Sequence, residues 1–209
     1  MHKNPILYRK ISKRSLRKGT SVIGIYGMCR YVGVTHLTLL LAFYLSDVCG
    51  YKVVVIEASG KDDIGSLEKM YHVQSESTNT NKFSYRNITF VGQAVTQEIG
   101  NYRNSSYDYC LIDLGGNYKQ AVNELLRCDL KIVVGTTAPW QRIVWKKLEE
   151  MFANIKDLSS WCVINNLSTK KQKSNINGFF NYYVIGLEPN ILHPSKDAIG
   201  TFRSLMNHK

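Results

Sequence analysis

Short apolar runs alternate with helical patterns along most of the chain. Strand-like runs, several of them apolar on both faces, occupy residues 21–27, 51–58, 108–116, 130–137, 160–167 and 181–188. Segments with helical length or spacing occupy residues 35–48, 117–128, 140–155 and 195–206. Strands that are apolar on both faces and separated by helices are typical of a parallel sheet with helices on each side. The pattern therefore predicts an α/β fold, a three-layer, doubly wound, mostly parallel sheet.

Two stretches fall outside this alternation. Residues 74–89, QSESTNTNKFSYRNIT, are polar and rich in Ser, Thr and Asn, which predicts a mobile surface segment. Residues 1–20 are basic and hold seven of the 27 Lys and Arg residues. With Arg30, eight basic residues precede the first acid, Asp47, so the first 46 residues carry +8 of the formal net charge of +11. In a chain of 209 residues, we expect a single domain over 21–209 behind a basic lead-in at 1–20.

The composition excludes several classes of protein. Hydrophobic residues at 44% and charged residues at 21% indicate a globular chain. The longest apolar run, residues 37–45, is far shorter than the roughly 20 residues of a membrane span, and no apolar segment of a secretory signal follows the basic start. The 5 cysteines include no CxxC pair and the 5 histidines show no ligand spacing. These features predict a cytoplasmic protein with reduced thiols and no metal cluster.

The first strand leads into a glycine-punctuated loop and then a helix. The loop reads GMCRYVGVTH, with the helix beginning at about Thr35. This order aims backbone N–H groups and the positive end of a helix at a phosphate, although a tight strand-to-helix turn also uses glycines such as Gly27 and Gly33. The P-loop pattern GxxxxGK(S/T) is not met, since Gly27 is one residue too far from Gly33 and Val34 stands in place of the lysine.

A second candidate group lies at the end of the strand within residues 108–116. The sequence LIDLGG places Asp113 at the carboxyl end of this strand, where open α/β sheets bind ligands. A strand that ends in Asp followed by Gly is typical of a Walker B element, whose carboxylate holds Mg²⁺ or its water. The alternative is that Asp113 caps a helix or shapes a turn.

These motifs, in this order, resemble the ParA/MinD group of deviant-Walker P-loop ATPases, including TadZ-like pilus-assembly members. The resemblance covers about residues 20–205. CRYVGVTH stands where that family has its KGGxGKTT loop, and VVVIEASG where it has an apolar strand ending in DxD. YDYCLIDLGG matches its Walker B strand and CVINN its VxxN strand, while VVGTTAPWQ and LEPN resemble later elements. The resemblance implies a P-loop NTPase fold and a site for ATP or ADP with Mg²⁺.

The resemblance also implies roles for individual residues. Gly33 matches the last loop glycine, and Asn165 matches the Asn that typically recognises adenine. Thr35 and Asp113 match the groups that bind Mg²⁺. The implied nucleotide site comprises Gly27, Arg30, Gly33, Val34, Thr35, His36, Asp113, Gly115 and Asn165.

The chain departs from the family pattern at charged positions. The signature lysine falls on Cys29, the universal lysine on Val34, and the carboxylate that positions the attacking water on Ser59. Because phosphoryl transfer depends on positioning and charge neutralisation, these losses predict a degenerate ATPase at most, with no catalytic residue assigned. Arg30 is either a substitute cation or a solvated loop charge, and His36 either a phosphate donor or a packing residue.

Two functions therefore remain open. The first is an ATP-binding switch or positioning and assembly factor with weak or absent hydrolysis, acting through dimerisation and protein partners. The second is a pseudo-ATPase scaffold that no longer binds nucleotide and serves as a platform for protein or membrane interactions. In either case, the basic residues 3–18 suit anionic lipid at the membrane periphery, nonspecific nucleic-acid contact, or a solubilising tail.

Overall fold

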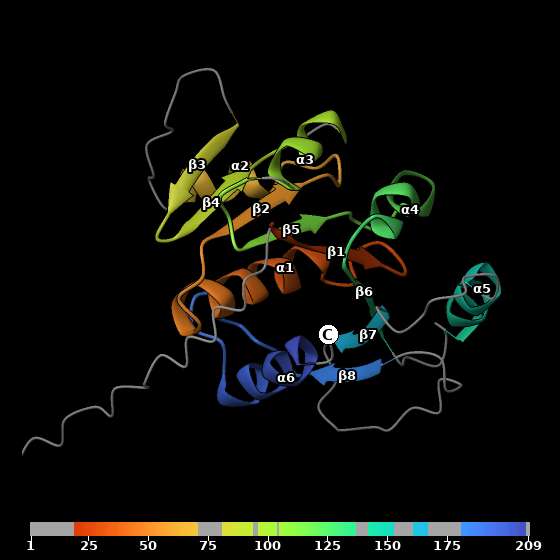
Figure 1. The fold of residues 1–209 in the computed structure, drawn as a ribbon. Helices are drawn as coiled ribbons and strands as arrows, with labels where there is room; N and C mark the ends of the chain where they lie inside the picture. The colour runs from red at the N-terminus through yellow and green to blue at the C-terminus, as the bar shows by residue number, and fades with distance from the viewer. Residues whose placement is uncertain are drawn as a thin grey trace, which may run out of the picture.

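The computed structural model describes residues 19–70, 81–93, 96–103, 105–136, 142–152, 161–166 and 181–207. These residues form an eight-stranded sheet in the order β3-β4-β2-β5-β1-β6-β7-β8 (Figure 1). The strands are β1 (Ser21–Gly27), β2 (Val53–Glu57), β3 (Lys82–Tyr85), β4 (Ile88–Val91), β5 (Tyr109–Asp113), β6 (Leu130–Gly135), β7 (Trp161–Asn166) and β8 (Asn181–Ile185). The β3–β4 pair is antiparallel and the other pairs are parallel. The predicted mostly parallel α/β sheet is confirmed.

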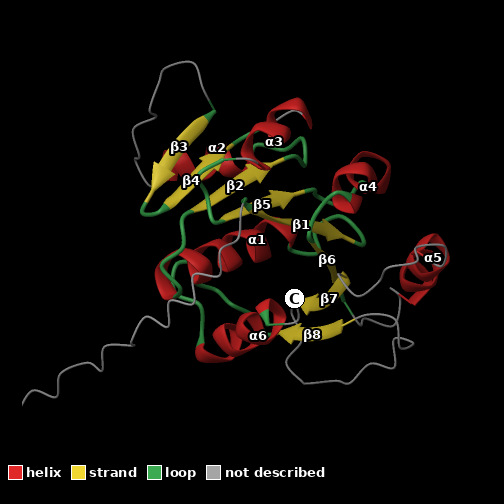
Figure 2. Ribbon diagram, in the orientation of Figure 1, coloured by secondary structure: helices red, strands yellow, loops and turns green. Residues whose placement is uncertain are grey.

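Helices cover both faces of this sheet (Figure 2). They are α1 (Val34–Phe43), which runs into the π-helical turn η1 (Tyr44–Val48), α2 (Asp63–Met70), α3 (Thr96–Arg103), α4 (Tyr118–Leu126), α5 (Arg142–Phe152) and α6 (Lys196–Met206). Helices α1 and α6 lie on one face, and α3, α4 and α5 on the other. No helix of the described residues has the length and apolar character that crossing a membrane requires.

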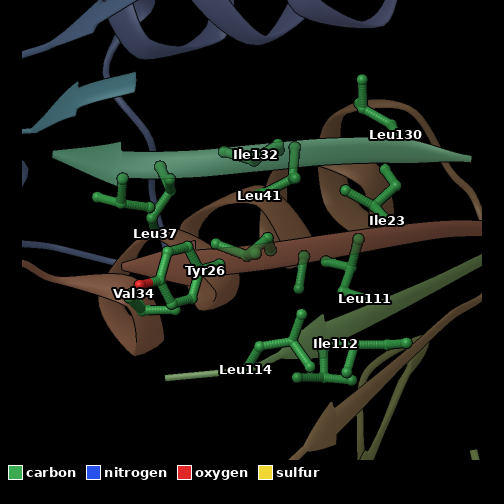
Figure 3. Close-up of a cluster of buried hydrophobic side chains, with 14 of the residues drawn as sticks. Ile23, Tyr26, Val34, Leu37, Leu41, Leu111, Ile112, Leu114, Leu130 and Ile132 are labelled. Atoms are coloured by element: carbon green, nitrogen blue, oxygen red, sulfur yellow. The ribbon is translucent and has the colours of Figure 1, made fainter. Parts of the chain in front are cut away.

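The core lies between α1 and the central strands. Every residue of β1 and β2 is buried, which explains why both strands are nearly continuous apolar runs. Helix α1 is apolar on most sides and buries eight of its residues. Figure 3 shows Leu37 and Leu41 of α1 beside Ile132 of β6 and Ile23 of β1. This packing fixes the start of α1 next to the end of β1.

The prediction for residues 74–89 was wrong over its second half. Residues 82–85 and 88–91 form β3 and β4, a hairpin at the edge of the sheet. Phe83 and Phe90 are buried and stack with their ring centroids 4.9 Å apart. The apolar residues alternate with polar ones as in a half-buried strand, and the polar composition of the longer stretch concealed this alternation. Residues 71–80 and the basic residues 1–18 lie outside the described residues.

Candidate functional site

The carboxyl ends of the parallel strands share one edge of the sheet. In the register of the sheet, Glu57 of β2 lies opposite Asp113 of β5, and Gly135 of β6 lies opposite Asn165 of β7. The chain leaves β1 toward β2 and leaves β5 in the opposite direction, toward β6. The crevice between β1 and β5 is therefore the topological switch point, where open α/β sheets bind ligands.

The loop between β1 and α1, residues 28–33, is anchored to the strands beside it. The N–H of Gly27 donates to the carbonyl of Gly115 (2.8 Å), and the N–H of Met28 donates to that of Val134 (2.9 Å). Gly116 lies so close to the loop that an added Cβ would be 2.7 Å from the carbonyl oxygen of Cys29. The position of the loop backbone therefore requires a residue without a side chain at Gly116.

Substituting Gly116 with alanine should disturb this anchorage. The new methyl group must displace loop backbone, which we expect to lower the free energy of unfolding by about 1–3 kcal/mol. Gly100→Ala is the control, because a Cβ at that helical position meets no described atom within 4 Å beyond its chain neighbours and the backbone of its own helix, and alanine there should raise stability by roughly 0.5–1 kcal/mol. Urea unfolding of both variants tests this, and equal responses would show that the loop moves freely.

Helix α1 begins with unpaired backbone donors. Its N-cap, Gly33, has a left-handed backbone (φ 93°), which glycine adopts without strain, and it supplies no side-chain cap. The first backbone bond of the helix runs from the N–H of Leu37 to the carbonyl of Gly33 (3.0 Å). The N–H groups of Val34, Thr35 and His36 therefore have no acceptor within the helix. Together with the helix dipole, they make an anion-binding end beside the loop.

Apolar side chains occupy the inner side of the loop. An added Cβ at Gly27 would lie 2.6 Å from Cγ2 of Val34 and 2.7 Å from Cγ1 of Val32. Both valines are buried, so the position of the expected lysine is packed against the end of β1. Arg30 is exposed and His36 is half-buried. The loop therefore offers backbone donors without a buried cation.

Asp113 is a fully buried carboxylate at the centre of the site. Its side chain is 0% exposed, Oδ1 accepts from the N–H of Gly115 (2.9 Å), and Oδ2 has no hydrogen-bond partner among the described residues. Burial raises the pKa of Asp113, while the hydroxyl of Thr35 and the Gly115 N–H lower it. A buried acceptor without a partner costs stability. A carboxylate oxygen beside a hydroxyl is also the donor set that Mg²⁺ prefers, so these residues fit a hard cation.

Glu57 has a structural role at the start of α2. Its Oε1 accepts from the N–H of Asp63 (3.1 Å) and its Oε2 from the N–H of Ile64 (3.3 Å), so the carboxylate caps the helix. The hydroxyl of Ser59 also donates to Glu57 (3.1 Å). Burial raises the pKa of Glu57, the hydrogen bonds oppose this, and Asp113 raises it further. Ser59, at the position expected for the water-positioning carboxylate, is thus engaged in the same cap.

No protein-family model and no curated protein matches this sequence, but solved structures do. A plasmid partition protein from Borrelia burgdorferi B31 bound to AMPPNP has a TM-score of 0.67 at 16% identity, over 91% of this chain and 98% of that chain. MinD from Pyrococcus horikoshii OT3 with Mg-ADP has a TM-score of 0.57 at 14% identity, over 89% and 94%. The MinC:MinD cell division complex of Aquifex aeolicus gives 0.62 at 18%, over 90% and 96%. The chain has the ParA/MinD fold.

The ParA/MinD fold brings most of the predicted site together. Gly27 ends β1, Gly33 ends the loop, Val34 and Thr35 begin α1, and Asp113 and Gly115 adjoin them at the end of β5. Asn165 lies on the same edge of the sheet but on β7, beyond β6, and is 1% exposed. Its predicted contact with adenine stays a prediction.

Two residues that the sequence patterns did not single out also belong to this site. Asp63, in the first turn of α2, accepts a hydrogen bond from the hydroxyl of Thr35 (3.3 Å). Lys61 lies near Asp63 and lowers the pKa of Asp113 by its charge. The sequence feature that could have indicated both residues is the Lys-Asp-Asp run at 61–63, which follows an apolar strand. Only the tertiary structure, in which Asp63 at the start of α2 meets Thr35 at the start of α1, shows that this run reaches the loop.

Proposed function

We propose that this protein is a positioning or assembly factor that binds ATP or ADP with Mg²⁺ and hydrolyses ATP weakly or not at all. The observation that carries the proposal is the buried, unpartnered Oδ2 of Asp113, close to the hydroxyl of Thr35 at the start of α1. An orphaned carboxylate of this kind is expected where a cation completes the site. The fold supports the same conclusion, since its neighbours include proteins with AMPPNP and Mg-ADP.

Each part of the site has a distinct role in this proposal. The first-turn N–H groups of α1, including those of Val34 and His36, receive the phosphates, and Arg30 lies in the same loop as an exposed cation. Thr35 and Asp113 hold Mg²⁺, which neutralises phosphate charge when it is bound. Asn165 is assigned to the adenine base.

Weak hydrolysis follows from the groups that surround the phosphate site. Val34 packs against the end of β1 where a lysine would neutralise transition-state charge, and the hydroxyl of Ser59 is directed to Glu57. Phosphoryl transfer needs charge stabilisation and a positioned nucleophile, and neither is supplied by these residues. We therefore infer a switch that changes state mainly by binding and releasing nucleotide.

The partners belong to the proposal as well. The MinC:MinD complex among the structural neighbours supports a protein partner for this chain. We propose that the chain also forms a homodimer. Residues 3–18, outside the described part of the chain, are proposed to contact anionic lipid or nucleic-acid phosphates nonspecifically. We place the protein in the cytoplasm or at the periphery of a membrane.

A pseudo-ATPase scaffold is the second candidate. The observation that favours it is the apolar lining of the loop by Val32 and Val34, which bury the space beside Gly27. In a scaffold that no longer binds nucleotide, the loop does not need space for a phosphate, so apolar side chains can fill it. The scaffold and the switch differ in one measurable property, nucleotide affinity.

Calorimetry on the full chain separates the two candidates. We expect binding of ATP and ADP that strengthens with Mg²⁺, and Thr35→Ala should weaken the Mg²⁺-dependent part by about tenfold, or ~1.4 kcal/mol. Thr35→Ser is the matched control, since it keeps the hydroxyl and should retain the Mg²⁺ effect. Absence of wild-type binding up to about 1 mM nucleotide, where the binding free energy is only about −4 kcal/mol, would favour the scaffold.

A further inference from the structure

A lysine from the connection between β2 and α2 reaches the loop that lacks its own lysines. The Nζ of Lys61 lies 5.4 Å from the centroid of the Tyr31 ring and 4.0 Å from Oδ2 of Asp63. Tyr31 belongs to the β1–α1 loop, has a left-handed backbone (φ 62°), and is 89% exposed. An ammonium group over a ring face is attracted to it. Lys61 therefore bridges two segments that are far apart in the sequence.

The same ammonium group is linked through Asp63 to Thr35, a proposed cation ligand. Asp63, its carboxylate partner, accepts a hydrogen bond from the Thr35 hydroxyl (3.3 Å). The charge of Lys61 also acts on the buried carboxylate of Asp113, whose Oδ2 lacks a hydrogen-bond partner among the described residues. Thr35 and Asp113 are the proposed Mg²⁺ ligands, so Lys61 lies beside the place where the outer phosphates of a nucleotide would meet the cation.

The backbone that carries Lys61 is held in place. Its N–H donates to the hydroxyl of Ser59 (3.3 Å), and that hydroxyl donates in turn to Glu57. On the other side, an added Cβ at Gly115 would lie 3.0 Å from Cβ of Ser59. The connection is thus packed against the residues that follow β5. This anchorage fixes where the lysine stem begins.

We propose that Lys61 is the phosphate-binding cation of this site, in place of the lysines that the loop has lost. This inference rests on the proposed nucleotide function. Lys61 and Asp63 are both about half exposed, at 45% and 47%, and an ion pair of this length between such groups is weak. A polyphosphate at the start of α1 carries more negative charge than one carboxylate, so the ammonium group turns from Asp63 to the phosphate. Asp63 then remains on the hydroxyl of Thr35 and orients it.

Binding of MgATP, MgADP and AMP to the full-length protein tests the proposal. Lys61→Ala should weaken MgATP binding by about tenfold, the effect of one charge-assisted contact. It should weaken MgADP binding less and leave AMP binding unchanged, because the lost contact is to an outer phosphate. Lys61→Arg should retain most of the affinity. Lys69→Ala is the matched control, since Lys69 is an exposed lysine in the last turn of α2.

Three other results would contradict the proposed role of Lys61, and one of them would also contradict the proposed nucleotide function. If the wild type binds MgATP and Lys61→Ala binds it equally well, Lys61 is only a surface ion-pair partner and the proposed function stands. If Lys61→Ala weakens AMP as much as MgATP, the lysine acts through loop structure. If the wild type binds no nucleotide, the proposed function fails together with this inference. Melting temperatures of the variants without ligand report any change in folding.

Discussion

Replacing Val34 with lysine is expected to raise the affinity for MgATP by about tenfold or more, since it adds a charge-assisted contact to a phosphate. Val34 is the first residue of α1 and is only 7% exposed, packed against the end of β1 beside Gly27. The long lysine stem can cover the same apolar surface while its ammonium group extends toward the loop. The substitution should also lower the stability of the ligand-free protein by about 1–2 kcal/mol, because a longer side chain must fit where Val34 packs closely beside Gly27.

Val34→Met is the control that separates charge from size. Methionine has a long, flexible, uncharged side chain and fills irregular apolar space, so its effect on stability should be similar and its effect on MgATP affinity small. Isothermal titration with MgATP and urea unfolding provide the two measurements. Equal MgATP affinities of the two variants would show that the loop does not present its N–H groups to a phosphate.

Replacing Asp113 with asparagine is expected to stabilise the ligand-free protein and to abolish its stabilisation by MgATP. Burial raises the pKa of Asp113 above its unfolded value, so the folded state binds a proton more tightly than the unfolded state. Stability therefore falls as pH rises from the unfolded pKa through the raised folded pKa, and it stays lower at neutral pH. Asparagine removes this loss while its carbonyl oxygen still accepts from the N–H of Gly115. A gain near neutral pH is expected because the neutral amide avoids the desolvation cost of the buried charge.

Asp108→Asn is the matched control at the opposite end of β5. Asp108 is exposed, and its Oδ2 accepts from the backbone N–H of Lys52 (2.8 Å), a bond that an amide oxygen preserves. Urea unfolding at acidic and neutral pH should show a flatter pH dependence for Asp113→Asn than for the wild type, and Asp108→Asn should keep the wild-type stability at neutral pH. Melting temperatures with and without MgATP complete the comparison. If Asp113→Asn is destabilised, or is still stabilised by MgATP, then Asp113 is a structural residue.

The order and type of the central elements follow from the sequence because they depend on local patterns. Continuous apolar runs predict strands buried on both faces, and β1, β2, β5, β6 and β7 all lie within the predicted ranges. Gly33 at the start of a helix and Asp113 at the end of a strand were also evident from their neighbours in the chain. A residue's place at the end of an element is a local property, so both were predicted on the correct edge of the sheet.

The edge hairpin shows where such local evidence failed. Phe83 of β3 and Phe90 of β4 bury their rings against one another, yet they lie in and next to a stretch of polar composition. A strand at the edge of a sheet needs few apolar residues, since only part of its surface meets the core. Strand β3 therefore depends on its pairing with β4, which in turn pairs with β2.

The sequence by itself determined the α/β class, the glycine-punctuated loop before α1, and the place of Asp113 at the end of a strand. The tertiary structure decided what surrounds them: Asp63 at the start of α2 accepts from Thr35, Lys61 lies over the ring of Tyr31, and Ser59 donates to Glu57. The order of the strands also places Asn165 on β7, beyond β6, although the sequence analysis assigned it to the same nucleotide site as Thr35 and Asp113. Periodicity reports which face of an element is buried, whereas the contacts of a site depend on which elements become neighbours, and that is settled only when the whole sheet assembles.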